Sequence, residues 1–516
     1  MDEHPNRIRS IAIVGGGTAG WMAAVALGHA HRHGPCTVRV IESDDIPTVG
    51  VGEATLPILR HFNRMFGIDE DEFMRATGAT FKAGIQFVDW ARIGHTFFHP
   101  FGGYGAPIER LRFHHYWLKQ RLMGAPWSLN AYAENSVAAE TNRFARPRWP
   151  TGEIPDNQYA FHFDAALYAA YLRQRAMAIG VERIEGRVDS VKLRETDGFI
   201  ESVRLASGEV IAADLFVDCS GFRGLLIEGA LHTGYEDWTH WLPCNRAQAV
   251  LCEGVDALTP YTRSTARKAG WQWRIPLQHR IGNGYVYCSQ HISDDEAAAT
   301  LLANLDGRAI DAPRLLRFTT GRRKLYWNRN CVAIGLASGF LEPLESSSIG
   351  LMQNAIFRML ELMPDRDFDQ ATLDEYNRQT IHETERTRDF IALHYHGSGR
   401  DDGPLWAYCR HMKLPETLRH RIALFRVRGH LPSLLGEPYG DTSWLVMLTE
   451  LGFMPRDYNP LVDAVPMDVV ERAMADIRNR IAAYVQTLPT HRAYVDAIAR
   501  ADTVRVEAGP AAVLQA

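Results

Sequence analysis

The chain has 516 residues, of which 46% are hydrophobic and 23% are charged, and its formal net charge is -5 at pH 7. That charge provides no basic surface for nucleic acid, and no apolar run approaches the roughly 18 residues of a membrane helix. A polar N-terminus leads directly into the first predicted strand, so we expect no signal peptide. We therefore expect a cytoplasmic protein of more than one folding module, without nucleic-acid or membrane partners.

The first predicted unit is a strand, a glycine turn and a helix. Residues 11–14 have the length and branching of a buried parallel strand, and Gly15, Gly17 and Gly20 follow as G-x-G-x-x-G. Residues 21–30 then form a helix of good helix formers. The three glycines permit a tight turn, let the backbone approach a pyrophosphate, and let the helix pack close to the strand.

A second strand, residues 37–41, ends at Glu42, where an acceptor for ribose hydroxyls belongs. The helix N-terminus before it leaves amide donors facing the phosphates. Strand, glycine turn, helix, strand and carboxylate in this order predict dinucleotide binding. The alternative is a glycine-rich turn in an unrelated α/β unit.

The middle of the chain carries a candidate lysine and an aromatic segment. Residues 81–90 alternate like a strand with Lys82 near its start, and residues 95–107 are typical of a binding loop, not of a core strand. The other predicted elements are helices starting near Thr55 or Pro57 and at 111–123, 163–179, 348–363, 373–395, 467–488 and 490–501, a hairpin at 183–205, and strands at 214–221 and 331–335.

Cysteine and histidine usage excludes two kinds of site. The seven cysteines are scattered and never form C-x-x-C, which suits a reducing compartment and argues against a disulfide framework. The histidine pairs, among them His394 and His396, lack the spacing of a metal motif. We expect these histidines at the surface or supporting a site, and we expect no metal.

Three strand ends are predicted to meet at one site: the glycine turn, the turn after residue 218, and the loop after residue 335. A glycine turn combined with a late strand and G-x-A-x-G is how FAD-binding oxidoreductases hold a flavin from both ends. The cofactor-binding candidates are Gly15, Gly17, Thr18, Ala19, Gly20, Glu42, Val51, Gly335 and Leu336. Because the chain has one G-x-G-x-x-G, the flavin is expected to be reduced by another protein.

We predict an α/β fold: an FAD-binding, doubly wound sheet of the flavin monooxygenase type with an interleaved, largely helical substrate module. The FAD module is assigned to residues 1–95, 160–235 and 325–365, and the substrate module to residues 96–159, 236–324 and 366–516.

A specific motif supports a family resemblance. Residues 271–276 form WQWRIP, an instance of W-x-W-x-I-P made by Trp271, Trp273, Ile275 and Pro276. Together with GGGTAG at 15–20, FKAGI at 81–85 and LEPLES at 341–346, it resembles the flavin-dependent tryptophan halogenase family. The likeness runs to about residue 360 and weakens in the helical C-terminal part. A structural aromatic pair on a strand is the alternative interpretation of the two tryptophans.

The resemblance implies a two-component enzyme that receives FADH2 from a separate flavin reductase, acts as a monomer or homodimer, and oxidises chloride or bromide to hypohalous acid. The oxidant would reach Lys82, either hydrogen-bonded by its ammonium or held as a haloamine. Glu345 matches the family's essential carboxylate, which would pair with Lys82 and either stabilise or deprotonate the cationic intermediate formed when halogen adds to the ring. Taken alone, Lys82 could be a surface lysine, and Glu345 a carboxylate favoured at a helix start.

Two further pairs of residues match the family pattern. Ser347 and Ser348 open a predicted helix, where their amides would bind halide; serine as an ordinary N-cap is the alternative, and family members more often have Thr-Gly here. His99 and Phe101 match the loop whose rings sandwich a substrate indole, with a core aromatic cluster as the alternative.

The chain departs from the family at residues 443–448, SWLVML, where enzymes acting on free tryptophan carry adjacent tyrosines that hold the amino acid. We therefore predict a halogenase acting on an electron-rich, indole-type aromatic. The alternatives are a flavin monooxygenase that hydroxylates an aromatic substrate and a non-catalytic flavin-binding protein.

Overall fold

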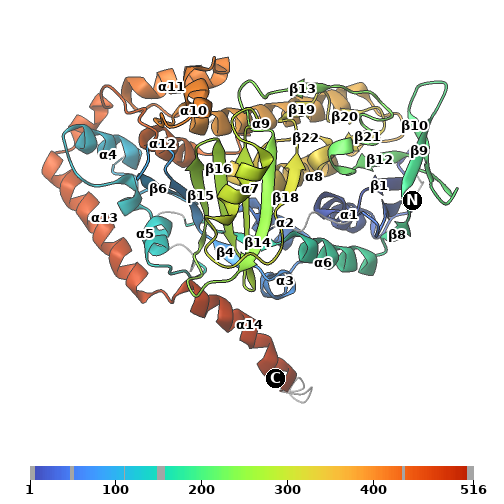
Figure 1. Cartoon of the computed structure of the whole chain (residues 1–516), viewed down its shortest axis with the longest axis horizontal. Coiled ribbons are helices and arrows are strands. Elements are labelled where there is room, and N and C mark those ends of the chain that lie inside the picture. The colour runs from blue at the N-terminus through green and yellow to red at the C-terminus, as the bar shows by residue number, and fades with distance from the viewer. Residues whose placement is uncertain (1–5, 47–51, 110, 148–156, 433–435, 508–516) are drawn as a thin grey trace.

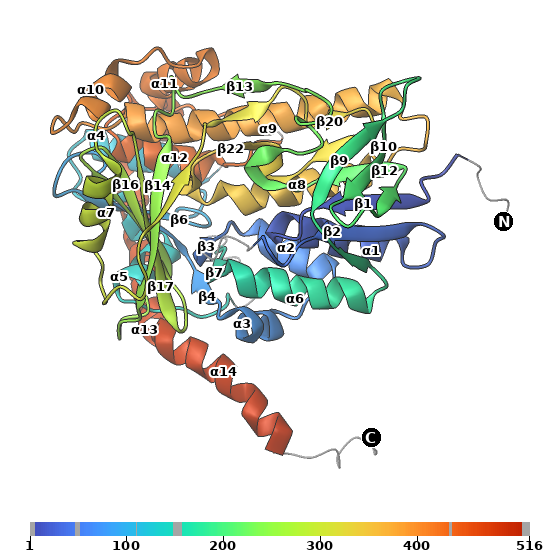
Figure 2. The ribbon, with the colours of Figure 1, turned by 45° about the vertical axis from the view of Figure 1, so that its right-hand side comes forward.

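The computed structural model describes residues 6–46, 52–109, 111–147, 157–432 and 436–507. Two sheets and a set of long helices organise the chain (Figure 1). A six-stranded sheet with helices α1 (Thr18–His31) and α6 (Ala165–Ala178) lies on the right of Figure 1, and a seven-stranded sheet stands in the middle. The turned view in Figure 2 shows α1 and α6 side by side beneath the long helix α9 (Gln370–His396).

The six-stranded sheet is the doubly wound unit that the sequence predicts. Its order is β20-β21-β12-β1-β2-β8, and β21, β12, β1, β2 and β8 are parallel neighbours. The bounds are β1 Ser10–Val14, β2 Thr37–Glu42, β8 Glu182–Glu185, β12 Leu215–Asp218, β20 Trp327–Asn328 and β21 Cys331–Ala333. Successive side chains of β1 alternate between two cores, since Ile11 and Ile13 pack in one cluster and Ala12 and Val14 in another.

The seven-stranded sheet has the order β18-β14-β17-β16-β15-β5-β6, with only β15 and β5 parallel. Its strands are β5 Gly84–Val88, β6 Thr96–Pro100, β14 Arg246–Glu253, β15 Tyr261–Arg267, β16 Gly270–Pro276, β17 Arg280–Tyr287 and β18 Arg314–Arg317. The prediction of a loop at 95–107 is wrong for its first half, because β6 pairs with β5 along its length. Its aromatic side chains are buried on this sheet.

The predicted single strand at 81–90 is divided between two sheets. Residues Thr80–Lys82 form β4, which pairs with β7 (Ala160–Asp164) beside β3 (Gly52–Ala54). At Ala83 the amide donates instead to Pro260 O at 2.7 Å, and the chain continues as β5 in the larger sheet. Lys82 therefore lies at the junction of the two sheets.

The other strands form two three-stranded sheets: β9 Val188–Leu193, β10 Ile200–Leu205 and β11 Val210–Ala212 in one, and β13 Tyr235–Asp237, β19 Gly321–Arg323 and β22 Gly339–Phe340 in the other. The predicted hairpin at 183–205 is confirmed for β9 and β10, which pair antiparallel. Its first residues differ, because β8 pairs with β2 in the doubly wound sheet. Helix α6 begins two residues later than predicted, because Phe163 belongs to β7 and the Asp164 carboxylate caps the helix.

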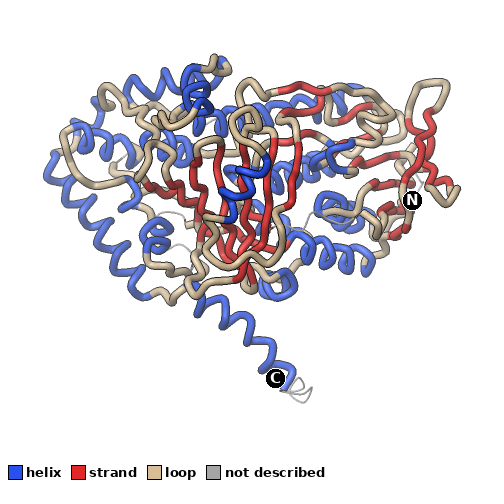
Figure 3. Tube along the Cα trace, in the orientation of Figure 1, coloured by secondary structure: helices blue, strands red, loops and turns tan. Residues whose placement is uncertain are grey.

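The tube in Figure 3 shows that helices surround both sheets. Their bounds are α2 Ile58–Met65, α3 Glu70–Thr77, α4 Phe113–Leu122, α5 Glu134–Glu140, α7 Asp294–Leu302, α8 Ser347–Glu361, α10 Pro404–His411, α11 Glu416–Arg428, α12 Asp441–Glu450, α13 Met467–Thr487 and α14 His491–Glu507. Among the described residues, every helix is either too short or too polar to span a lipid bilayer.

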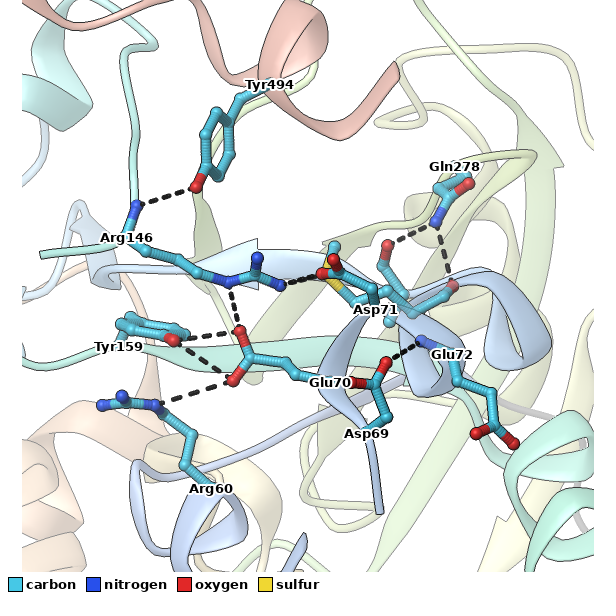
Figure 4. A network of polar contacts seen from close by, with 11 residues as sticks. Arg60, Asp69, Glu70, Asp71, Glu72, Arg146, Tyr159, Gln278 and Tyr494 are labelled. Carbon is cyan, nitrogen blue, oxygen red and sulfur yellow. Dashed lines mark hydrogen bonds and ion pairs between the residues drawn. The ribbon is translucent and has the colours of Figure 1, made fainter. Parts of the chain in front are cut away.

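A polar network fixes the start of the C-terminal helix α14 against the body (Figure 4). The Arg146 guanidinium pairs with the carboxylates of Glu70 and Asp71 at the start of α3. The Tyr159 hydroxyl donates to Glu70 at 2.9 Å, and Tyr494 of α14 accepts from the Arg146 amide at 3.4 Å. The far end of α14 extends away from the body at the bottom of Figure 1.

Candidate active site

The three predicted strand ends meet around the glycine turn. Gly15 has φ +115°, and a Cβ there would lie 2.2 Å from the Cys219 carbonyl oxygen, just after β12. A Cβ on Gly20 would lie 1.8 Å from the Gly15 oxygen, so only glycine lets α1 approach the turn this closely. Gly335, after β21, lies against Ala19 on the other side of α1.

This cradle fits a dinucleotide phosphate. Gly17 precedes Thr18 at the start of α1, and no described side chain caps the helix. The space above the Gly17 Cα is open, and the first-turn amides point into it. An FAD pyrophosphate therefore finds donors and room here without displacing any capping side chain.

Glu42 ends β2 beside the turn. Its carboxylate accepts from Arg183 Nε at 2.6 Å and from Trp21 Nε1 at 3.2 Å, and a Cβ on Gly16 would overlap it. The side chain thus reaches across the glycine turn, where the sequence predicts the ribose contact. Val51, also a cofactor candidate, lies outside the described residues.

Two cavities lie on either side of the start of α8. A small one, about 50 Å³, is lined by Gly335, Leu336 and Ser348 among others. A larger one, about 370 Å³, is lined by Ser347, His99 and Phe101 among others. Residues 347 and 348 therefore separate the cavity with the flavin-side candidates from the cavity with the aromatic candidates, and Leu351 lines both cavities.

Lys82 is fully buried at the end of β4. Its Nζ donates to Ser346 Oγ at 2.6 Å and to the Thr55 carbonyl at 3.1 Å, and it lies 5.1 Å from the centre of the Phe101 ring. Burial lowers the pKa of the Lys82 ammonium to about 7, against the opposing effect of the Glu345 charge. Both the ammonium and the neutral amine are accessible near neutral pH.

Glu345 is also fully buried, and two imidazoles contact its carboxylate. His99 Nδ1 lies 3.1 Å from Oε2, and His394 Nε2 lies 2.7 Å from Oε1. Burial raises the pKa of the Glu345 carboxyl, but the two histidines outweigh that effect and lower it to about 2. An ionised carboxylate is therefore held beside a buried lysine that titrates near neutrality.

His99 and Phe101 take their positions from the pairing of β6 with β5. Ile85 pairs with His99, and the Phe101 amide donates to the Ala83 carbonyl at 2.8 Å. Since Ala83 follows Lys82, this register places the Phe101 ring next to the lysine, and the His99 ring contacts Glu345 instead. Both side chains line the larger cavity, and His99 contacts Glu345 in addition.

The W-x-W-x-I-P motif lies on β16 and supports both charged candidates. Trp271 Nε1 donates to Glu342 Oε2 at 2.7 Å, which holds the loop that carries Glu345. At the other end, the Pro276 carbonyl accepts from Thr80 Oγ1 at 2.7 Å, in the strand that carries Lys82. Trp273 packs over Gly284, and Ile275 packs against Gly52.

Glu342 has a second donor, because Tyr395 OH donates to its Oε2 at 2.7 Å. Burial raises the pKa of the Glu342 carboxyl to about 7, against the lowering effect of both hydrogen bonds. The residue therefore joins β16, α9 and the loop before α8 in one buried cluster.

Sequence reasoning assigned no individual role to His394 and missed Ser443. His394 was grouped with surface or supporting histidines, yet it is fully buried on α9 and contacts Glu345. Ser443 Oγ lies 2.9 Å from His99 Nε2. The signals available were weak: a lone histidine in a long helix and a serine in a segment that lacks the family pattern.

The segment 443–448 lies on α12, and Trp444 to Leu448 are buried in the core. Only Ser443 of this segment lines the larger cavity. Within the described residues, no group of three or more His, Cys, Asp or Glu could hold a metal ion.

Comparison with known proteins gives one consistent family. The family model described as tryptophan halogenase matches residues 10–467. The chain is 36% identical to tryptophan 6-halogenase ThaL from Streptomyces albogriseolus, covering 94% of this chain and 97% of that protein. The structure of BrvH, a flavin-dependent halogenase from Brevundimonas sp. BAL3, is 47% identical with a TM-score of 0.92, covering 96% and 99% of the two chains. Xcc4156, a flavin-dependent halogenase from Xanthomonas campestris, is 43% identical with a TM-score of 0.92, covering 95% and 98%.

Proposed function

Since the chain belongs to the tryptophan halogenase family, we propose how its own residues carry out flavin-dependent halogenation. It is an oxidoreductase that uses FAD and halide, and the family obtains reduced flavin from a separate reductase and acts on aromatic substrates. Reduced FAD, when bound, supplies the electrons with which oxygen converts halide to hypohalous acid. The residues of this chain bind the cofactor and the halide, direct the hypohalous acid to the substrate, and take up the proton that the ring releases.

We assign the FAD site to the glycine turn, Thr18, Ala19, Glu42, Gly335 and Leu336. The uncapped start of α1 and the close packing at Gly15 and Gly20 support this assignment. We assign halide binding to the amides of Ser347 and Ser348, because they form the first turn of α8 and lie between the two cavities.

Lys82 and Glu345 carry the chemistry in this proposal. The Lys82 ammonium holds hypohalous acid and donates a proton to its oxygen, which leaves as water when the aromatic ring takes the halogen. The ring C–H bond then breaks, its electron pair returns to the ring, and Glu345 accepts the proton. The observation that carries the proposal is the full burial of this lysine and carboxylate at Ser346, because Lys82 donates to the Ser346 hydroxyl and Glu345 directly precedes that serine.

The larger cavity favours a neutral aromatic over free tryptophan. Among the described residues that line it, none is lysine or arginine, so a substrate carboxylate would lack a cationic partner there. Its two carboxylates, Glu383 and Glu437, are already paired with Arg358 and Arg421. We therefore propose an indole-type substrate held between His99 and Phe101.

The test uses purified protein with FAD, an unrelated flavin reductase, NADH and oxygen, in chloride or bromide. Indole and tryptophan are offered separately, and products are identified by mass spectrometry beside a Lys82→Ala control. A halogen isotope pattern on indole that disappears in the control supports the proposal. Product from tryptophan alone would contradict the substrate assignment. An oxygenated product independent of halide would favour the monooxygenase alternative.

All seven cysteines are free in the structure. This supports our placement of the enzyme in the reducing cytoplasm, where reduced flavin is also generated.

A further inference from the structure

The hydroxyl of Ser443 faces the imidazole of His99 at the edge of the larger cavity, with Oγ 2.9 Å from Nε2. We propose that Ser443 is a positioning residue for Glu345: its hydroxyl, bonded to Nε2, holds the His99 ring in the orientation in which Nδ1 donates to the carboxylate. This inference rests on the proposed function of Glu345 as the base. In this proposal Ser443 supports the carboxylate that accepts the ring proton, whereas enzymes acting on free tryptophan use the same segment to hold the amino acid.

The protons around Glu345 can be assigned from the partners. His394 Nδ1 lies 2.8 Å from the Phe390 carbonyl, which can only accept, so Nδ1 of His394 carries a proton. Its Nε2 lies 2.7 Å from Glu345 Oε1. An ionised carboxylate requires a donor there as well, so both nitrogens of His394 carry protons and the ring is held between the backbone of α9 and Glu345.

Among the described residues, His99 has no backbone partner that fixes its proton in this way. Its Nδ1 faces both oxygens of Glu345, at 3.2 and 3.1 Å, and an ionised carboxylate requires a donor there. A neutral imidazole with a proton on Nδ1 leaves a lone pair on Nε2, and a hydroxyl can donate to it. If the ring becomes charged, the same hydroxyl accepts from Nε2, so Ser443 holds the ring in place in both charge states.

The groups that face Glu345 come from several elements: His99 on β6, His394 on α9, Lys82 on β4, and Tyr439 before α12. The tyrosine is buried and stays a phenol, since burial raises its pKa well above the usual value. Without Ser443, Nε2 of His99 loses the hydrogen bond that holds the ring, and the ring can turn so that Nδ1 no longer donates to the carboxylate. Glu345 then loses a donor, and its proton affinity rises.

The experiment compares Ser443→Ala, Ser443→Thr and Thr449→Ala with the wild-type enzyme. Thr449 is a matched control, because its hydroxyl donates only to its own helix, at Leu445 O and Val446 O among the bonds observed. For Ser443→Ala we expect kcat to fall about tenfold, with KM changed less than about threefold, the effect of one lost hydrogen bond on the barrier. The acid limb of the kcat–pH profile should move to higher pH, while Ser443→Thr and Thr449→Ala keep the wild-type profile.

Profiles of Ser443→Ala and wild type that superimpose would overturn the inference, as would an equal loss in Ser443→Thr. If Ser443→Ala does not fold, nitrogen-15 histidine NMR of the wild-type protein still answers the question, with the His99 signal assigned by its loss in His99→Gln. A protonated Nδ1 together with a hydrogen-bonded Nε2 supports the inference, and a bare Nδ1 or an Nε2 without a hydrogen bond overturns it. The NMR measurement requires no catalytic turnover, so it tests this inference independently of the proposed function. Failure of the proposed function would be seen separately, as wild-type protein that forms no halogenated product.

Discussion

Replacing Glu345 by glutamine removes the proposed base and keeps its shape. General base catalysis contributes about 10²- to 10⁴-fold in rate, so we expect kcat to fall by that range, equivalent to about 2.7–5.5 kcal/mol in the barrier. The loss should appear in kcat more than in KM, because the base acts only when the ring gives up its proton.

The structure indicates that glutamine fits this site. With the carboxylate charge removed, His394 can release its Nε2 proton while it keeps the Nδ1 proton on the Phe390 carbonyl, and its Nε2 then accepts from the new amide NH2 placed where Oε1 lies. The amide oxygen then accepts from His99 Nδ1. Both hydrogen bonds survive but lose their charge assistance, which costs about 2 kcal/mol in total and lowers Tm by about 4 °C or less.

The assay separates halide oxidation from halogen transfer. In Glu345→Gln, a diffusible 1,3-diketone trap should still be halogenated at close to the wild-type rate, while the aromatic product falls. Thermal unfolding of the same preparation checks the small Tm change. Aromatic halogenation within tenfold of wild type would refute the reasoning, because it would show that the ring proton leaves without this carboxylate.

Three further predictions test other parts of the site. Because burial lowers the pKa of Lys82 to about 7 and the ammonium is the proposed donor, kcat should fall as pH rises through about 7; a rise would indicate that the neutral amine, and hence a haloamine, is the reactive form. Gly20→Ala should weaken FAD binding at least about tenfold in a fluorescence titration, since its Cβ would overlap the Gly15 oxygen and push α1 from the turn, and unchanged affinity would disprove this account. Trp271→Phe should lower the free energy of unfolding by about 1–3 kcal/mol, because the buried Glu342 carboxyl loses a donor; chemical denaturation with no change in midpoint would argue against that role.

The sequence pattern correctly predicted those parts of the chain whose structure depends on residues close by in the sequence. The run before Gly15 and the spacing of the glycines determine the turn, because strand branching, helix formation and close approach are all decided within about ten residues. Lys82 and Glu345 could be selected only through the family resemblance. Nothing in either segment shows that the chain brings them together around Ser346.

The remaining contacts depend on pairings over long separations. His394 and Glu345 lie 49 residues apart, and His99 and Ser443 lie 344 apart. The division of 81–90 into β4 and β5 could not be predicted from the sequence either. The alternation of side chains is the same whether a strand stays in one sheet or changes partner at Ala83.

The start of α14 touches the strand that carries Lys82. His491 is fully buried; its Nε2 accepts from the Phe81 amide at 3.1 Å, and its Nδ1 lies 3.1 Å from the Leu258 carbonyl. Phe81 and His491 are separated by 410 positions, so at about 5–20 residues per second a ribosome needs about 20–80 s to make the second after the first. During that interval the lysine strand lacks its last support, and a chain cut short before residue 491 never gains it. The order of synthesis thus makes the surroundings of Lys82, the proposed halogen-transferring residue, one of the last features of the enzyme to be completed.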